Sequence, residues 1–289
     1  MPSLIDLRRR IRSVKNTQQI TKAMKVVSAA KLRRAQDRVL AARPYAESIA
    51  RMLANVAQAA DESPDGEAAD LLAIRPEKRI QLLVITADRG LAGAFNSNII
   101  RTAQKFIQEK SDAEVQLELI GRKGRDFFRR RHGHITGEYS TIFQKVVRIE
   151  DALEIARKVT DRFRKGEIDA VYLVVNNFKS MMSSNLVTAR ILPVEIPAKE
   201  KQEQIDYIYE QPPGELLQGL VPRYIEAQIY RALLESAAAE HAARMTAMEA
   251  ASSNAAEVID ALTLKMNRVR QASITREIIE IVSGAAALD

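Results

Sequence analysis

The stretch RYIEAQIYRALLESAAAEHAARMTAMEAASSNAAEVIDALTLKMNRVRQASITREIIEIVS, Arg223 to Ser283, decides the fold of this chain. Its 61 residues include no Gly and no Pro, and strong helix formers such as Ala, Leu, Glu, Met, Arg and Gln dominate it. A continuous helix of this length would extend about 90 Å. A compact domain built from 289 residues cannot enclose it. The helix must therefore protrude or lie against a second long helix.

The other end of the chain supplies a second helix, because Ser3 to Arg43 is also free of Gly and Pro. Its apolar residues recur at spacings of three and four, but the stripe drifts, so an amphipathic helix is predicted rather than a strict heptad. Pro44 is a candidate kink. An antiparallel coiled coil is expected from residues 1–60 and 215–289, with the long C-terminal helix beginning after Pro222. The N-terminal stripe comprises Leu4, Leu7, Ile11, Val14, Ile20, Met24 and Val27, and the C-terminal one includes Met245, Met248, Ala251, Ala255, Val258 and Leu262.

Between the two helices the apolar pattern changes to short runs that are typical of buried strands. A linker or exposed loop is expected at 61–76, and a globular domain at 77–197. Strands that alternate with helices predict a small three-layer, Rossmann-like α/β domain with a mostly parallel sheet. The expected strands are 79–87, 115–120, 170–176 and 186–192, the last an edge strand closed by Pro193, and the expected helices are 98–108, 123–131 and 149–165.

The chain carries few residues suited to catalysis or metal binding. It has no cysteine and only three histidines, and no Ser-His-Asp order or carboxylate pair stands out. The loop DRGLAG, Asp88 to Gly93, lacks the lysine and hydroxyl of a phosphate-binding loop, so its glycines are interpreted as turn residues. We therefore expect no catalytic, cofactor or metal site. No membrane span, signal peptide or transit peptide is predicted.

Positive charge is concentrated at the N-terminus, where residues 1–43 carry a net charge of +10. Such a strip indicates either a polyanion surface or a helix that faces an acidic partner. A basic coiled-coil nucleic-acid-binding protein is therefore one alternative, although the Leu and Ile stripe favours packing. A stand-alone α/β enzyme is another, which the missing catalytic residues argue against.

Both ends of the chain carry motifs of one known family. LRRRIRSVKNTQQITKAMKVVSAAKLRRAQ, Leu7 to Gln36, resembles the N-terminal helix of the gamma subunit of F-type ATP synthase. RQASITREIIEIVSGAAAL, Arg270 to Leu288, resembles the C-terminal signature of that family, and ADRGLAGAFN resembles its loop after the first strand. Ala92 stands where many members have Cys. The resemblance extends over essentially the whole chain.

The resemblance implies a central rotor stalk that couples ion-driven rotation of the c-ring to conformational cycling of the beta-subunit catalytic sites. Its expected partners are three alpha and three beta subunits, the epsilon subunit and the c-ring, at the cytoplasmic side of a bacterial plasma membrane. Nucleotide chemistry would belong to alpha and beta. By family match, Lys22, Met24, Lys25, Arg270, Gln271, Thr275 and Glu277 would contact the alpha/beta hexamer, and Tyr207, Tyr209 and Glu210 would contact the c-ring and epsilon.

Overall fold

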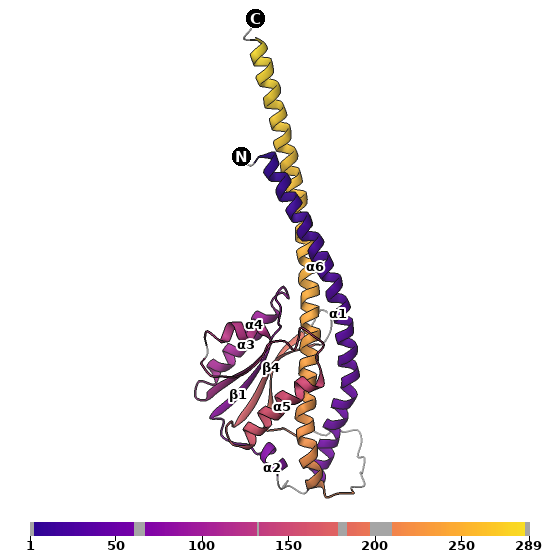
Figure 1. The fold of residues 1–289 in the computed structure, drawn as a ribbon, viewed down its shortest axis with the longest axis vertical. Helices are drawn as coiled ribbons and strands as arrows, with labels where there is room; N and C mark the ends of the chain where they lie inside the picture. Colours follow the sequence, from indigo (N-terminus) through magenta and orange to yellow (C-terminus); the bar gives the residue numbers. More distant parts are fainter. Residues whose placement is uncertain (1–2, 61–66, 132, 179–183, 197–209, 287–289) are drawn as a thin grey trace. The chain divides into compact units, whose positions relative to one another are not determined.

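The computed structural model describes residues 3–60, 67–131, 133–178, 184–196 and 210–286. It divides into two units that are described separately below. Unit 1 combines residues 1–29 with 244–289, and unit 2 comprises residues 30–243. Helix α1 (Leu4–Ala59) and helix α6 (Pro213–Ala286) contribute to both (Figure 1).

Unit 2 is built on a five-stranded sheet in the order β3-β2-β1-β4-β5. The first four strands are parallel, and β5 pairs antiparallel with β4 at the edge. The mostly parallel sheet and its edge strand confirm the predicted fold class. The strands are β1 (Arg79–Ile85), β2 (Glu114–Ile120), β3 (Ile135–Tyr139), β4 (Ala170–Phe178) and β5 (Ser184–Leu192), and the helices are α2 (Glu67–Leu72), α3 (Phe95–Glu109), α4 (Arg122–Phe128) and α5 (Ile149–Arg164).

Successive residues of a strand point to opposite faces of the sheet. Helices pack on both of these faces. On one face Phe106 of α3 packs against Tyr172 of β4, with ring centroids 4.9 Å apart. On the other face Lys158 and Arg162 of α5 reach residues of β1 and β2. The layers helix, sheet and helix make the predicted three-layer domain.

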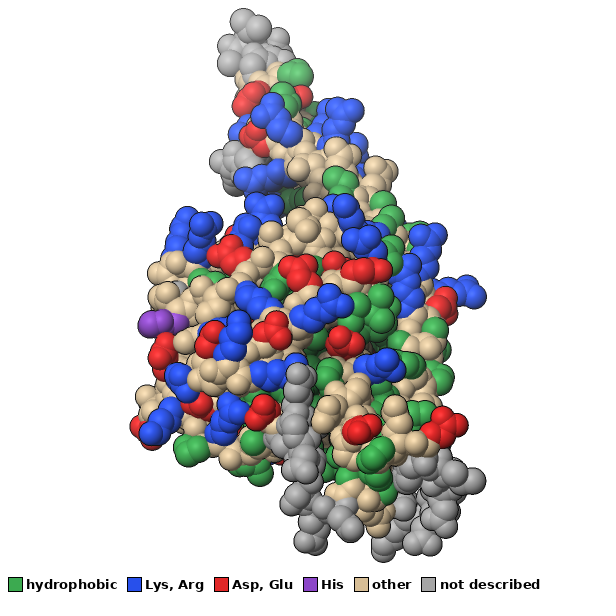
Figure 2. All heavy atoms as spheres, turned by 60° about the horizontal axis from the view of Figure 1, so that its bottom comes forward, with side chains coloured by type: hydrophobic (Ala, Val, Ile, Leu, Met, Phe, Trp, Pro, Cys, Tyr) green, Lys and Arg blue, Asp and Glu red, His purple; other side chains and the backbone are tan. Residues whose placement is uncertain are grey.

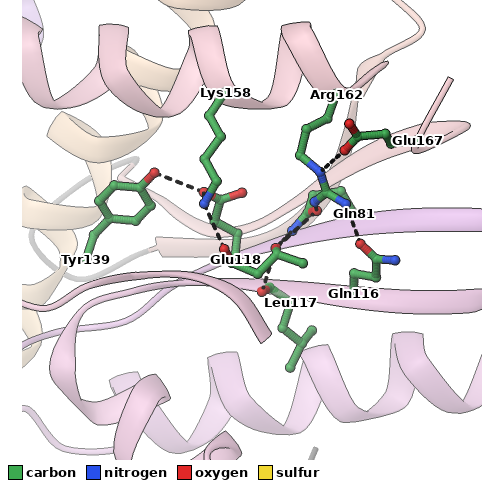
Figure 3. A network of polar contacts seen from close by, with 9 residues as sticks. Gln81, Gln116, Leu117, Glu118, Tyr139, Lys158, Arg162 and Glu167 are labelled. Atoms are coloured by element: carbon green, nitrogen blue, oxygen red, sulfur yellow. Dashed lines mark hydrogen bonds and ion pairs between the residues drawn. The ribbon is translucent and has the colours of Figure 1, made fainter. Parts of the chain in front are cut away.

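A buried polar network joins α5 to the sheet, and Figure 3 shows Lys158 and Arg162 pointing from the helix onto the strands. The Glu118 side chain is fully buried and forms an ion pair with Lys158 at 3.0 Å. Tyr139 of β3 donates its hydroxyl hydrogen to the same carboxylate at 3.0 Å. Burial, with the Glu118 charge beside it, raises the pKa of Tyr139. Arg162 donates to the side chains of Gln81 and Gln116, so the network ties three strands to one helix.

The network also explains β3, a strand that was not predicted. Its sequence ITGEY contains Gly137, and glycine weakens a strand pattern. A Cβ atom at residue 137 would lie 2.5 Å from Lys158 Nζ and 2.6 Å from Glu118 Oε1. The glycine is required by the close approach of this ion pair to the backbone.

Replacing Gly137 by Ala should therefore destabilise unit 2. Lys158 can withdraw towards solvent, but Glu118 would then be a buried carboxylate without its cation. The expected loss is about 1–3 kcal/mol in the free energy of unfolding, measured by urea denaturation. Gly133→Ala is the control, since no heavy atom lies within 4 Å of a Cβ there. Equal stability of the two variants would contradict this account.

Two sequence predictions about unit 2 are wrong in detail. Helix α6 begins at Pro213 and continues through Pro222, instead of beginning after it. An internal proline costs about 3 kcal/mol, but Leu217, Val221 and Ile225 are almost completely buried on the same helix, so packing offsets the cost. The expected loop at 61–76 contains α2, whose Leu71 is fully buried; residues 61–66 lie outside the described part.

Unit 1 is an antiparallel pair of helix segments, as predicted, but its seam is a regular heptad. The less exposed residues of α1 recur at alternating spacings of four and three, and several of them are polar. The apolar stripe drifted because it included Ile20 and Val27, which are 60% and 55% exposed. Val258 of α6 is likewise 46% exposed. The seam positions of α1 are Leu7, Ile11, Val14, Gln18, Thr21, Lys25 and Ser28.

Polar side chains in the seam are paired across the two helices. The hydroxyls of Thr21 and Ser252 lie 2.7 Å apart, and Gln18 donates to the Ser252 carbonyl at 3.4 Å. Lys25 forms an ion pair with Glu249. Paired residue numbers thus sum to between 270 and 274, so Met24 lies opposite residues near 249, inside the window of 242–259 that the helix lengths predict.

Candidate partner-binding surface

The outer surface of unit 1 exposes large apolar side chains. Ile20, Val26 and Val27 are 60%, 67% and 55% exposed on α1, while the seam contains polar residues. An isolated coiled coil would normally place apolar residues in the seam and polar residues outside. Exposed apolar side chains that form a stripe mark a surface that another protein covers. The apolar residues of this stripe can be recognised in the sequence. The sequence analysis, however, assigned all of them to packing between the two helices.

The three candidate residues on α1 lie in unequal surroundings. Lys22 is exposed, whereas Met24 and Lys25 are half-buried. The Lys25 ammonium already pairs with Glu249, and both side chains remain partly accessible at 42% and 57%. Of the three, Lys22 is therefore the cation with most of its surface available to a partner.

The four candidate residues on α6 lie in a segment without a helical partner in unit 1. With the observed register, Leu4 at the start of α1 faces about residue 270, so α6 continues alone beyond that point. Figure 1 shows this yellow segment running past the indigo end of α1. Arg270, Gln271, Thr275 and Glu277 are all exposed there.

This unpaired segment is apolar as well as exposed. Ile278 and Ile279 are 55% and 58% exposed, and Ile281 and Val282 are 71% and 61% exposed. A solvated single helix would normally carry one apolar stripe at most. The segment is therefore suited to enclosure by a partner rather than to contact with water.

Of the three residues expected to contact the c-ring and epsilon, the structure describes only Glu210. Glu210 is exposed and precedes the first turn of α6. Tyr207 and Tyr209 lie outside the described residues.

The carboxyl edge of the sheet in unit 2 is the place where Rossmann-like folds usually bind ligands. Here the buried carboxylate of Asp88 accepts hydrogen bonds from the backbone N–H groups of Arg122 at 2.9 Å and Phe143 at 3.0 Å. Burial raises the pKa of Asp88, although these N–H donors favour its charged form. An acidic side chain of the protein itself thus takes the amide donors that a phosphate group would need.

Other kinds of site find little support in the described residues. They contain no group of three or more His, Asp or Glu side chains placed to hold a metal ion. None of their helices is both long and apolar enough to cross a membrane. On the face of the sheet domain shown in Figure 2, Lys and Arg side chains alternate with Asp and Glu. The features that stand out are those of unit 1.

Comparison with known proteins shows which protein family this chain resembles. A family model described as ATP synthase matches residues 3–288. A protein named ATP synthase gamma chain from Solibacter usitatus (strain Ellin6076) is 60% identical over 289 residues, covering 100% of both chains. One from Pelotomaculum thermopropionicum is 51% identical over 290 residues, again covering 100% of both.

One of the solved structures that are similar to this chain also comes from an ATP synthase. It is a chain of the mitochondrial ATP synthase central stalk and c-ring from Tetrahymena thermophila, with a TM-score of 0.61 and 27% identity. The match covers 81% of this chain and 99% of that one. None of these similarities supports the nucleic-acid alternative.

Proposed function

This chain belongs to the ATP synthase gamma-chain family, and from that premise we propose that it is the central rotor stalk of an F-type ATP synthase. Rotation of the c-ring turns the chain, and its asymmetric coiled coil drives the beta-subunit catalytic sites through successive conformations. The observation that carries the proposal is the exposed, apolar end of α6 that continues beyond the first residues of α1 and needs an enclosing partner.

The proposed partners are three alpha and three beta subunits around the coil, with epsilon and the c-ring at the other end. Arg270, Gln271, Thr275 and Glu277 would contact the top of the hexamer, and their exposure supports this. Lys22, Met24 and Lys25 would lie beside acidic segments of beta, with Lys22 the most accessible cation. Tyr207, Tyr209 and Glu210 would contact the c-ring and epsilon.

The chain itself is proposed to be non-catalytic. Asp88 occupies amide donors at the carboxyl edge of the sheet, which removes a natural phosphate site. ATP chemistry would then take place on alpha and beta. The chain would be peripheral at the cytoplasmic face of a bacterial plasma membrane, in a proton-translocating complex, and any membrane contact would run through its partners.

A rotation assay tests the proposal directly. The chain contains no cysteine, so Ser111→Cys at an exposed position gives one attachment point for a bead. In a complex with surface-fixed alpha and beta subunits, ATP should drive one-way rotation with three dwell angles in each turn. A bead that stays still while the complex hydrolyses ATP, or a tagged chain that fails to purify with alpha and beta, would overturn the proposal.

A further inference from the structure

Two neighbouring rows of side chains on α1 have the spacing of a coiled-coil seam between residues 18 and 28. One row, here called the polar row, comprises Gln18, Thr21, Lys25 and Ser28. The other, here called the apolar row, is displaced by one residue and comprises Ile20, Met24 and Val27. Within each row the spacings alternate between three and four, so either row could face α6.

Hydrophobic burial favours the apolar row. Ile20 and Val27 are 60% and 55% exposed in unit 1, and Met24 is half-buried. Turning α1 by the angle of one residue, about 100°, would bring this row against α6 and remove apolar surface from water. The structure instead places the polar row in the seam, where Thr21 and Ser28 are 8% and 3% exposed. Another interaction must therefore oppose the hydrophobic effect.

The upper part of the seam does not by itself decide between the rows. Leu7, Ile11 and Val14 extend the polar row towards the N-terminus and fix the upper part of α1 in the same rotation. Coiled coils tolerate local changes of winding, as stutters and stammers show. Because the apolar row begins six residues after Val14, such a change could bring Ile20 to face α6.

Polar contacts across the two helices supply the opposing interaction. The hydroxyls of Thr21 and Ser252 lie 2.7 Å apart, and both residues are buried. Gln18 donates to the Ser252 carbonyl at 3.4 Å. Lys25 forms an ion pair with Glu249. If the apolar row occupied the seam, the Ser252 hydroxyl would lie against aliphatic side chains without Thr21, and a buried hydroxyl without a partner is costly.

We propose that Thr21 and Ser252 are positioning residues: their buried hydrogen bond keeps the polar row in the seam and holds the apolar row outwards, where a partner can cover it. A buried polar pair can specify the alignment of a coiled coil at some cost in stability. Both hydroxyls are buried, so neither needs to touch the partner. That this partner is the alpha/beta hexamer rests on the proposed function, whereas the choice between the rows is a property of the free chain.

Disulfide formation in the free chain tests which row faces α6. The chain has no cysteine, so an introduced cysteine pair reports on this section alone. One pair, Ser28→Cys/Met245→Cys, joins seam positions, since these residue numbers have the same sum as those of Thr21 and Ser252. The second pair, Val27→Cys/Met245→Cys, samples the apolar row. The seam pair should form its disulfide much faster, because the bond needs Cβ atoms about 3.5–4.5 Å apart.

The double variant Thr21→Ala/Ser252→Ala removes both hydroxyls. It should lower the ratio of the two disulfide rates about fivefold, the effect expected for one net hydrogen bond. Thr21→Ser keeps a hydroxyl and should retain the ratio of the parent chain. The matched control is Thr17→Ala/Ser253→Ala, which removes the same residue types at exposed positions. Circular dichroism melting verifies that each variant is folded.

An unchanged ratio in the double variant, an equal fall in its control, or a fall in Thr21→Ser would overturn the proposal. The same variants, without the cysteines, are then tested for association with alpha and beta subunits. The double variant should associate about fivefold more weakly, while Thr21→Ser and the control should match the parent chain. Full association despite a lowered ratio would also overturn the positioning role. A complex whose bead does not rotate would refute the rotor proposal without altering the result for the free chain.

Discussion

Deleting residues 275–289 should leave the melting temperature of the free chain nearly unchanged and should strongly impair the assembled complex. The deleted segment includes the proposed contact residues Thr275 and Glu277. Loss of only about 1.4 kcal/mol of interface free energy reduces an association constant tenfold, and central interface residues often contribute more. We therefore expect about a tenfold or larger loss in assembly or in ATP synthesis per rotation.

The expected stability of the free chain follows from the register of unit 1. The pairs Thr21–Ser252 and Lys25–Glu249 place the start of α1 opposite about residue 270. Beyond it, every described side chain from Gln271 to Ser283 is exposed except Ser273, which is half-buried. Among the residues whose side chains the structure describes, the deletion removes almost no buried area, so it should remove little free energy of unfolding.

The measurements are calorimetry of the free chain and ATP-driven proton pumping of the reconstituted complex. Arg276→Ala provides a point-substitution control, because it leaves the helix length and the four proposed contact residues intact. If the complex with the deletion variant pumps protons as efficiently per ATP as the parent complex, the free end of α6 makes no contact that the complex needs for its function.

Much of the fold could be predicted because buried strands can be recognised in the sequence as short runs rich in apolar residues. The strands β1 and β4 contain continuous runs of Val, Leu and Ile, whereas β2 alternates polar and apolar residues, and their parallel order follows from the helices between them. The strand β3 could not be predicted from local pattern. Its glycine reflects a contact with Lys158 and Glu118, residues remote in sequence.

The coiled coil could be predicted in its direction but not in its seam. Helix lengths alone constrained the partner of Met24, because both helices obey the same rise per residue. The seam itself runs through Gln18, Thr21 and Ser252, whose polarity hides them from any search for apolar residues. Local pattern also cannot show that Ile20 and Val27 face outwards, because that depends on where the second helix lies.

The candidate site was predicted only through family likeness, and the structure adds the physical reason for part of it. Exposure of Arg270, Gln271, Thr275 and Glu277 follows from the unequal lengths of the paired helices.

Replacing both Met245 and Met248 by Asp should have the opposite effect from the terminal deletion. Met248 is 5% exposed and Met245 is half-buried, and both lie on the part of α6 that α1 covers. Leaving a buried charge uncompensated costs about 3–5 kcal/mol, which corresponds to a fall of about 6–20 °C in melting temperature for a chain of this size.

The control for this double variant is Thr246→Asp, which adds a carboxylate to the same turn at an exposed position. It should change the melting temperature by about 2 °C at most, since surface substitutions usually alter the free energy of unfolding by about 0.5 kcal/mol or less. Met248→Leu, which keeps the apolar volume, should also be close to the parent chain. The decisive comparison is between the seam variant and the deletion of residues 275–289. If the deletion lowers the melting temperature as much as the two aspartates do, the end of α6 is held by this chain itself. It would then not depend on an enclosing partner.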